Sequence, residues 1–536
     1  MQDFAQYLIL IIIILGLVMV ANRLRLAYPI VLVVGGLLLS FFTQFSQLTI
    51  SPDLVFFIFL PPLLYEAAWQ VSWKEFWKWR RIITGFAFPI VIFTSTIIAF
   101  ISTALIPGFT LALGFLLGGI ISPPDAVSAT TIMRRLKLPK AMMSIAEGES
   151  LLNDATSLIV FRFALAAVIT GHFSFSDAAV EFVLVVFMGV LIGLAIGLAF
   201  YLVHRWLPTT TSIDIVMTIV APYCMYYAAE QFHFSGVLAV VSGGLFLSSK
   251  RQTMLSFRSR IAGVNVWTNL VFVLNGLVFI LIGLQLPSII AQLGGTSLPA
   301  AIWFGLAISL VLMLTRMVCT LGASVFSTFM SNFITVADAH PGWRNPAILG
   351  WSGMRGVVSL AMALSIPITI DGEPFPYRNL ILFITFVVIL ATLVFQGMTL
   401  PWVIRKLNPE DHYTKIPMPE QELLIRKKMA HASLKFLEEK YSEVRESNEH
   451  VGNLFVQMTA DVEALERELG GTGGDVPYGE FHGIYVEMLE HQRDMLNEMN
   501  SRDEYDEDLI RKYLALVDIE EFKMREKLQR EDDLEA

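Results

Sequence analysis

One long apolar stretch carries a dense group of oxygen-bearing side chains. In AEGESLLNDATSLIVFR, Ser150, Asp154 and Ser157 stand at positions i−4, i and i+3, so on a helix their oxygens share one face. Glu149 and Asn153 form a neighbouring row, also four residues apart. A carboxylate grouped with hydroxyls suits protons or small hard cations, whereas soft metals prefer thiolates and imidazoles. The pattern therefore predicts a proton or hard-cation site at Asp154; a polar helix hydrogen-bonded to its neighbours is the alternative.

A second apolar stretch is interrupted by two prolines. In GGIISPPDAVSATTIMRRL, Pro123 and Pro124 lack the N–H groups that the helical carbonyls of Gly119 and Ile120 would accept, so the helix breaks or kinks here. Asp125 follows at once. The pattern predicts free carbonyls, a helix start and a carboxylate in one place, and a simple proline kink is the alternative.

A third stretch combines glycines with an arginine. In ILGWSGMRGVVSLAMALSIP, three glycines interrupt an apolar run and Arg355 falls at the expected break. A guanidinium stays protonated in proteins and needs a buried anion as its partner. The sequence does not choose among the available carboxylates, which are Asp125, Glu147, Glu149 and Asp154.

The composition shows what kind of protein must position these residues. Of 536 residues, 55% are hydrophobic and 16% charged, against about 25% charged in soluble domains. The net charge of −9 is unevenly divided: residues 1–408 hold 22 basic and 15 acidic side chains, and residues 409–536 hold 16 and 32. The first part, at +7, is too apolar for a water-soluble surface, and the second, at −16, is too charged to enter a bilayer.

Thirteen apolar runs, each near the ~20 residues that cross a bilayer, occur in residues 1–408. They are residues 4–22, 28–46, 52–68, 82–105, 110–133, 141–170, 178–204, 212–230, 234–249, 262–285, 299–330, 345–367 and 377–404. This predicts an all-α polytopic membrane domain. An ionisable side chain inside a span costs at least a few kcal/mol, and non-helical backbone at that depth is tolerated where it lines a site or cavity.

The basic residues predict the topology, because Lys and Arg collect on cytoplasmic loops. With the N-terminus outside, an inner-membrane chain of thirteen spans places 18 of the 22 basic side chains inside. They are Arg23, Arg25, Lys74, Lys78, Arg80, Arg81, Arg134, Arg135, Lys137, Lys140, Arg205, Lys250, Arg251, Arg258, Arg260, Arg344, Arg405 and Lys406. Only Arg378 falls outside, and Arg162, Arg316 and Arg355 lie within spans, the first two without an indicated role.

Two features lie near the predicted third span. Glu66 follows a pair of prolines in FLPPLLYEAAW and either contributes to a cation path or lies near the cytoplasmic edge. After it, Trp69, Trp73 and Trp77 recur every four residues beside basic side chains, which is typical of a short helix lying at the membrane interface.

The spans show an internal symmetry. If the seventh is a linker, spans 1–6 and 8–13 form two six-helix units of opposite orientation, and the proline-interrupted span 5 corresponds to the glycine-interrupted span 12. Matching interrupted helices in inverted repeats mark the substrate site of many transporters. The sequence thus predicts two inverted repeats with crossed broken helices.

The part beyond residue 408 reads as a separate acidic tail. Apolar residues recur among its charges at helical spacing, and Gly470, Gly471, Gly473 and Gly474 predict a flexible loop between helical segments. It carries no phosphate loop, metal-ligand cluster or basic nucleic-acid face. We expect residues 409–536 to form a helical cytoplasmic domain with a regulatory role.

The motifs SPPDAV, GESLLNDATS and GMRGVVSLA resemble the signatures of bacterial NhaP-type sodium/proton antiporters and the related animal Na+/H+ exchangers, over residues 1–408. The resemblance implies a homodimer, each protomer having a dimerisation domain and a six-helix core. It implies that Asp154 binds Na+ or H+, with Ser150, backbone carbonyls near Asp125 and Glu66 as further contributors. It also implies that Glu149 pairs with Arg355.

The same resemblance implies that Asn153, preceding the key aspartate, marks electroneutral exchange of one Na+ or Li+ for one H+. Pro124 stands where the family often has a threonine, so only a carbonyl can serve there. We expect a non-enzymatic antiporter without cofactors, involved in pH homeostasis. A K+/H+ antiporter of the same fold is the main alternative, and a cation channel is less favoured because no filter-like repeat occurs.

Overall fold

The computed structural model describes residues 2–24, 28–42, 55–136, 138–171, 175–291, 293, 296–333, 342–370, 372–409, 418–469, 478–500 and 507–535. The chain forms two compact units, residues 1–410 and 411–536. Each is described by itself below.

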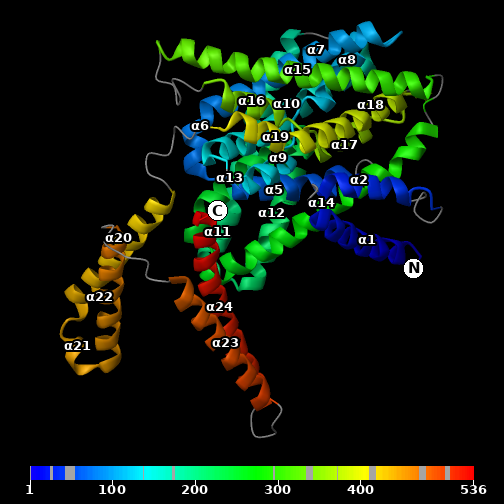
Figure 1. The fold of residues 1–536 in the computed structure, drawn as a ribbon. Coiled ribbons are helices and arrows are strands. Elements are labelled where there is room, and N and C mark those ends of the chain that lie inside the picture. Colours follow the sequence, from blue (N-terminus) through cyan, green and yellow to red (C-terminus); the bar gives the residue numbers. More distant parts are fainter. Residues whose placement is uncertain are drawn as a thin grey trace. The chain divides into compact units, whose positions relative to one another are not determined.

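The first unit, here the membrane unit, is built from helices (Figure 1). Their bounds are α1 Gln2–Leu24, α2 Tyr28–Leu39, α5 Leu60–Gln70, α6 Trp73–Gly85, α7 Val91–Leu105, α8 Leu111–Ile121, α9 Ala126–Arg135, α10 Lys140–Thr170, α11 Phe175–Trp206, α12 Thr211–Gln231, α13 Gly236–Met254, α14 Phe257–Ala291, α15 Leu298–Met330, α16 Arg344–Trp351, α17 Val357–Leu364, α18 Arg378–Ala391 and α19 Gly397–Leu407. One-turn π-helices, η1 Val55–Phe59, η2 Phe86–Ile90 and η3 Thr392–Gln396, join or extend them.

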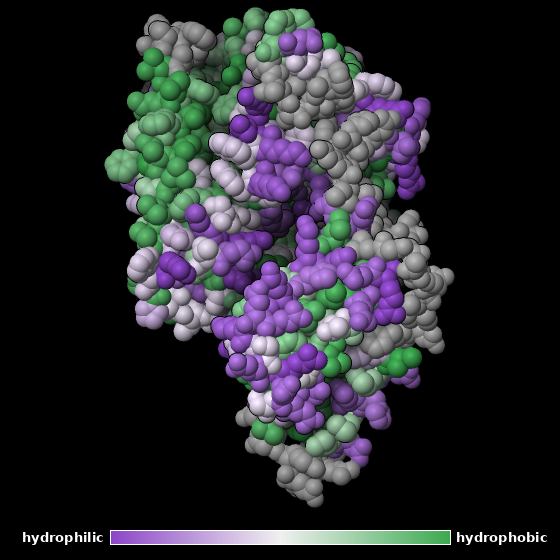
Figure 2. All heavy atoms as spheres, turned by 90° about the vertical axis from the view of Figure 1, so that its left-hand side faces the viewer, coloured by the Kyte–Doolittle hydropathy of each residue, from purple (hydrophilic) through white to green (hydrophobic). Residues whose placement is uncertain are grey.

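The all-α membrane fold predicted from the sequence is confirmed. Within the described residues, each of the thirteen predicted spans overlaps one helix or consecutive helices, and eight helices there are long and apolar enough to cross a bilayer. Large apolar side chains are exposed along the helices of the membrane unit, and Figure 2 shows a broad hydrophobic area on the face it displays. Among them are Ile12 and Met19 on α1 and Leu310 and Val318 on α15.

One local prediction is wrong. Trp73 and Trp77 do not belong to a separate interfacial helix, because α6 continues through η2 into α7 as one helical run, Trp73–Leu105. Trp79, also on α6, is fully buried, and its Nε1 donates to the Glu75 carboxylate at 3.0 Å. The amphipathic pattern therefore marks the first turns of a membrane helix.

The packing divides the membrane unit into two groups of helices. The first, the scaffold group, comprises α1, α2, α5 and α11–α14; the second, the core group, comprises α6–α10 and α15–α19. Within the scaffold group α11 packs on α13 and α2 on α14, and within the core group α10 packs on α8, α6 and α9.

Two broken helices cross inside the core group. The segment 122–125 separates α8 from α9, and the segment 352–356 separates α16 from α17. The Asp125 N–H donates to the Met354 carbonyl at 2.7 Å, so the two breaks touch. α8 packs against α17, which is the pairing of first half with second half that opposite orientations produce. The predicted crossing of two interrupted helices is present.

A short antiparallel β-ladder follows the second broken helix. β1 Thr369–Ile370 pairs with β2 Glu373–Pro374, with Thr369 opposite Pro374. It leads directly to α18.

The second unit, residues 411–536, consists of two helix pairs. α20 Met418–Tyr441 packs on α22 Glu449–Leu469, with the short α21 Val444–Ser447 between them in sequence, and α23 Tyr478–Asn500 packs on α24 Glu507–Glu535. The glycines predicted to form a loop lie outside the described residues. Lys427 and His431 hydrogen-bond to the Glu466 carboxylate at 3.2 and 3.1 Å and hold its pKa below the ordinary value.

The α2–α14 crossing generates a stability prediction. A methyl group at Gly283 would lie 2.5 Å from the backbone nitrogen of Leu37 and 2.8 Å from the carbonyl carbon of Gly36. Gly283→Ala therefore has to separate the helices, at a cost of about 1–3 kcal/mol, and should lower the thermal unfolding midpoint in detergent. Gly263→Ala on the same helix has no atom within 4 Å of the added carbon and should not lower it. Equal midpoints for the two variants would contradict this packing.

Candidate functional site

A cavity of about 360 Å³ lies among α5, α9, α10 and α14. Its lining includes Glu66, Asp125, Ser150 and Asp154. The structure thus gathers around one space four residues that the sequence singled out separately on three predicted spans. Asp154 is buried, with 7% of its surface exposed.

The α10 helix is fastened to the broken helix beside it by polar side chains. Ser150 Oγ accepts from the Ala126 N–H at 3.3 Å, and Asn153 Nδ2 donates to the Pro124 carbonyl at 3.4 Å. Asn153 does not line the cavity; its amide is occupied by the proline carbonyl. Asn153 Oδ1 is buried without a hydrogen-bond partner among the described residues.

The Gly119 carbonyl, which the sequence predicted to be free, accepts a hydrogen bond from a side chain. Ser157 Oγ, one turn beyond Asp154, donates to the Gly119 carbonyl, the group that Pro123 leaves without its helical partner. The serine therefore has a structural explanation, because it stabilises the end of α8. Its Oγ also lies 3.7 Å from Met362 Sδ on α17.

Asp125 occupies the break between α8 and α9. Its Oδ1 accepts from the Val127 N–H at 3.1 Å, which caps the start of α9. The close approach of the second broken helix requires Gly356, since an added Cβ there would lie 2.5 Å from Asp125 Oδ2. Asp125 is half-buried, and it lines the cavity together with Asp154.

Arg355 is fully buried at the crossing and binds backbone rather than a carboxylate. Its Nε donates to the Ile121 carbonyl at 2.9 Å and its Nη2 to the Ser122 carbonyl at 3.2 Å, and Nη1 donates to Gly353. The first two carbonyls end α8, where the helix dipole places partial negative charge. Arg355 therefore closes the end of one broken helix from its position in the other.

The predicted pairing of Glu149 with Arg355 is corrected by the structure. Glu149 faces Arg316 on α15, whose Nη1 and Nη2 donate to Oε1 and Oε2 at 2.8 and 3.0 Å, with both side chains at most 4% exposed. This two-pronged geometry satisfies both carboxylate oxygens. Arg355 instead donates to three backbone carbonyls.

Arg316 is the functional-site neighbour that sequence reasoning left without a role. Its signal was present, since an arginine within a span requires an anion. The sequence does not show that the packing of α15 brings Arg316 close to Glu149. Arg316 Nη2 also donates to the Leu349 carbonyl on α16 at 3.4 Å.

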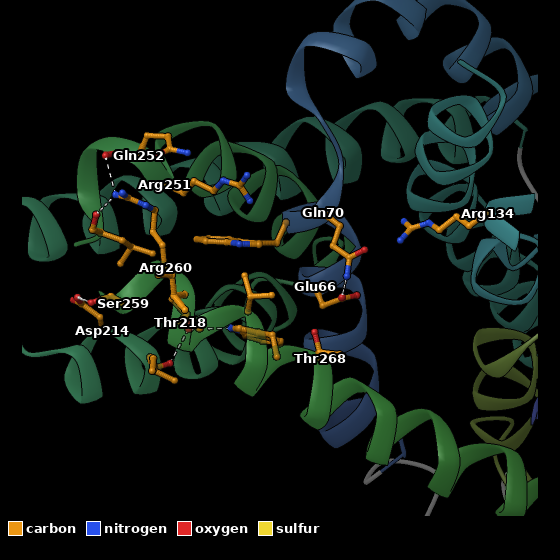
Figure 3. Close-up of a pocket in the computed structure, with 17 residues that line it drawn as sticks. Glu66, Gln70, Arg134, Asp214, Thr218, Arg251, Gln252, Ser259, Arg260 and Thr268 are labelled. Carbon is orange, nitrogen blue, oxygen red and sulfur yellow. Dashed lines mark hydrogen bonds between the residues drawn. The ribbon is translucent and has the colours of Figure 1, made fainter. Parts of the chain in front are cut away.

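A second cavity of about 540 Å³ adjoins the first and shares four lining residues with it, Glu66, Gln70, Arg134 and Thr268. Figure 3 shows Glu66 and Gln70 on one helix, hydrogen-bonded to each other, and the Arg134 guanidinium across the opening from them. Arg134 pairs with Glu147 at 2.8 Å. The far wall carries Arg251 and Arg260, so the opening lies at the end of the unit where basic residues gather, here called the basic end.

The scaffold group holds a buried polar cluster that the sequence did not reveal. His204 Nδ1 and Asp214 Oδ1 lie 2.9 Å apart, and Ser259 Oγ donates to Asp214 Oδ2 at 2.6 Å. The three residues come from the ends of α11, α12 and α14, which no single sequence motif connects. They tie these helices together beside the second cavity.

Crossed broken helices with a buried carboxylate beside them define a secondary transporter of the inverted-repeat type. Residues 9–406 match the family described as sodium/hydrogen exchanger, transmembrane, and the chain belongs to this family. It is similar in fold to the sodium proton antiporter MjNhaP1 from Methanocaldococcus jannaschii, with a TM-score of 0.61 and 16% identity over 76% of this chain and 100% of that one.

Two relatives show how far the sequence similarity extends. The sodium, potassium, lithium and rubidium/H+ antiporter of Bacillus pumilus is 34% identical over 74% of this chain, and the matched segment spans 61% of that protein. The uncharacterized Na+/H+ exchanger Rv2287 of Mycobacterium tuberculosis is 29% identical over 94% of this chain and 93% of its own length. The second match extends beyond the membrane unit.

The revised ion pair can be tested by a double-mutant cycle on thermal stability. Glu149→Gln leaves a buried guanidinium unpaired and should cost about 3–5 kcal/mol. Adding Arg316→Gln should then cost much less than it does alone, because the two losses are shared. The matched comparison is the double variant of Glu149→Gln with Arg355→Gln. Its loss of stability should be closer to the sum of the two single losses. Stronger coupling of Glu149 to Arg355 than to Arg316 would contradict the assignment.

Proposed function

We propose that this protein exchanges Na+ or Li+ for H+ across the cell inner membrane, with Asp154 as the exchange site. The observation that carries the proposal is the position of this buried carboxylate. It lines a cavity with Asp125 and Ser150 beside a break in two helices. Oxygen ligands of this kind suit a hard monovalent cation, which is the transported substrate and not a resident cofactor.

Exchange follows if the carboxylate takes one ligand at a time. A proton or a Na+ ion neutralises Asp154, and each excludes the other. A bare carboxylate passing an apolar barrier faces a large desolvation cost, so the site changes sides only when loaded. Ser150 is proposed as a further Na+ ligand, Asp125 contributes through its carboxylate or nearby carbonyls, and Glu66 contributes from the scaffold side.

The charges at the crossing support one-for-one exchange. Within the core group, Asp125, Glu149 and Asp154 contribute three formal negative charges, and Arg316 and Arg355 contribute two positive charges; Glu66, on the scaffold group, is not counted. The sum, −3 + 2 = −1, becomes zero on binding either one Na+ or one H+. The two loaded states therefore carry the same charge, which agrees with the electroneutral exchange expected from Asn153.

The proposal also concerns which monovalent cation is exchanged. The names of the similar proteins include sodium antiporters and an antiporter of sodium, potassium, lithium and rubidium. Exchange of K+ for H+ by the same site is therefore the second candidate. The names support a monovalent cation/proton antiporter in either case.

We place the basic end in the cytoplasm, because Lys and Arg accumulate on cytoplasmic loops. This puts the N-terminus outside and residues 409–536 in the cytoplasm, where we propose that they regulate the exchange. We also propose a homodimer, as the family resemblance implies. The protein would then serve sodium transport and pH homeostasis.

The site assignment is tested by Asp154→Asn in everted vesicles loaded with a pH-sensitive dye. The amide keeps the shape of the side chain but carries no exchangeable proton or charge, so Na+-, Li+- and K+-induced proton movement should fall to background. Glu181→Gln removes an exposed carboxylate from α11 and should leave exchange intact. Exchange by folded Asp154→Asn at the parent rate would overturn the assignment, and the parent's response to the three cations would decide between Na+ and K+.

Charge balance gives a separate prediction. With the membrane potential clamped by K+ and valinomycin, Na+/H+ exchange by the parent should proceed at the same rate at 0 mV and at an imposed potential, because each cycle moves no net charge. A control ionophore that carries charge should respond to the same potential. A rate that follows the imposed potential would exclude one-for-one exchange.

A further inference from the structure

Arg162 and Glu230 form an ion pair that the exchange site itself does not use. Arg162 Nη2 on α10 donates to both carboxylate oxygens of Glu230 on α12, at 2.7 and 2.6 Å. Glu230 Oε1 also accepts from the Gly236 N–H at the start of α13, at 3.1 Å. The carboxylate is therefore held in place by its own group of helices, and the arginine reaches it from another.

The pair lies on the far side of the exchange site from the cavity opening. Arg162 is eight residues after Asp154 on α10, which is ~12 Å along the helix. The Arg134–Glu147 pair lies in the opposite direction along α10, at the basic end, and Arg134 lines both cavities. The cavity thus extends from Asp154 toward the basic end, and the Arg162–Glu230 pair lies toward the other end of the unit.

The pair also joins the two groups of helices. α10 packs mainly on α8, α6 and α9 in the core group, whereas α12 packs on α11, α13 and α14 in the scaffold group. Asp125 and Ser150, which line the cavity together with Asp154, belong to the core group. A contact that ties α10 to α12 therefore fixes the site relative to the scaffold.

We propose that the Arg162–Glu230 pair is a latch between the core and scaffold groups that closes the route from Asp154 to the side opposite the basic end. It stabilises the arrangement seen here and has to break before the site can open to that side. This rests on the proposed exchange function, since exchange requires access to Asp154 from both sides in turn.

The exposure of the pair suits a contact that breaks in every cycle. The two side chains are 35% and 28% exposed, so protein does not enclose the pair on all sides and the pair can separate without opening the protein interior. By contrast, the Arg316–Glu149 pair within the core group is nearly fully buried and would leave uncompensated charges if it opened. A partly exposed pair contributes modestly, which sets the expected shift of the equilibrium at no more than about fivefold.

The test measures access to the cavity without requiring transport. In a background with Cys224→Ala and Cys319→Ala, a reporter cysteine replaces Thr131, which lines the cavity. Everted vesicles expose the basic end, and a membrane-impermeant maleimide labels the reporter in the absence of Na+. Arg162→Gln and Glu230→Gln should each lower the initial labelling rate, by at most about fivefold, since fewer molecules keep the cavity open. Arg162→Lys should retain most of the parent labelling rate, because a single nitrogen of Arg162 makes both contacts with Glu230.

Arg378→Gln is the matched control. This arginine is predicted to lie on the same side as the latch, but it donates to the Ile366 and Leu364 carbonyls within the core group. Its loss should leave the labelling rate unchanged, with total reporter measured after denaturation in every sample. Unchanged or faster labelling in both latch variants would overturn the proposal, and so would an equal loss in Arg378→Gln. Retained exchange by Asp154→Asn would instead refute the proposed function and would not alter the labelling result.

Discussion

The structure of the membrane unit depends on satisfying backbone polar groups where two helices are interrupted. Breaking a helix inside hydrocarbon exposes carbonyls and N–H groups that cost several kcal/mol each if left unpaired. Here the partners are supplied across the crossing: Asp125 N–H binds Met354, Arg355 binds Ile121 and Ser122, and Thr392 Oγ1 accepts from the Arg355 N–H at 3.1 Å. Each broken helix is thus completed by the other or by its neighbour, and neither break could persist alone.

The same constraint explains why the crossing contains arginines. Arg355 fills its place with several donors in a plane, which a lysine ammonium could not supply in that geometry. Its charge then has to be balanced within the low dielectric of the core, as does that of Arg316, whose direct partner is Glu149. With Asp125 and Asp154 included, these core-group charges sum to zero when one proton or one monovalent cation is bound. Under the proposed function, the polar groups that hold the fold together would therefore also set the charge that the site accepts.

The sequence predicted most of this arrangement because local chemistry decides it. Paired prolines free particular carbonyls, glycines interrupt a helix, and a carboxylate among hydroxyls on one helical face marks the site; Ser157 binding to Gly119 is a direct consequence. The partner of Glu149 could not be predicted in the same way. Arg316 and Arg355 are both intramembrane arginines, and only the packing of α15 on the core distinguishes them. The prediction of a separate interfacial helix at Trp73–Arg81 was wrong for a related reason, since an amphipathic pattern does not show whether a helix ends or continues.

The hydrogen bonds near Asp154 show which cavity residues are joined to α10 and the first broken helix and which belong to the scaffold group. Ser150, Asn153 and Ser157 bind α8, α9 or the segment between them, so α10 and the first broken helix are fastened to each other on three successive turns. Glu66 and Thr268 line the same cavity but belong to the scaffold group. Under the proposed function, movement of one group past the other would keep the proposed ligands Asp154, Ser150 and the break together, while Glu66 would stay with the scaffold group. Glu66 would then influence how the cation enters or leaves at the basic end, whereas Asp154 would bind the cation or the proton that is carried.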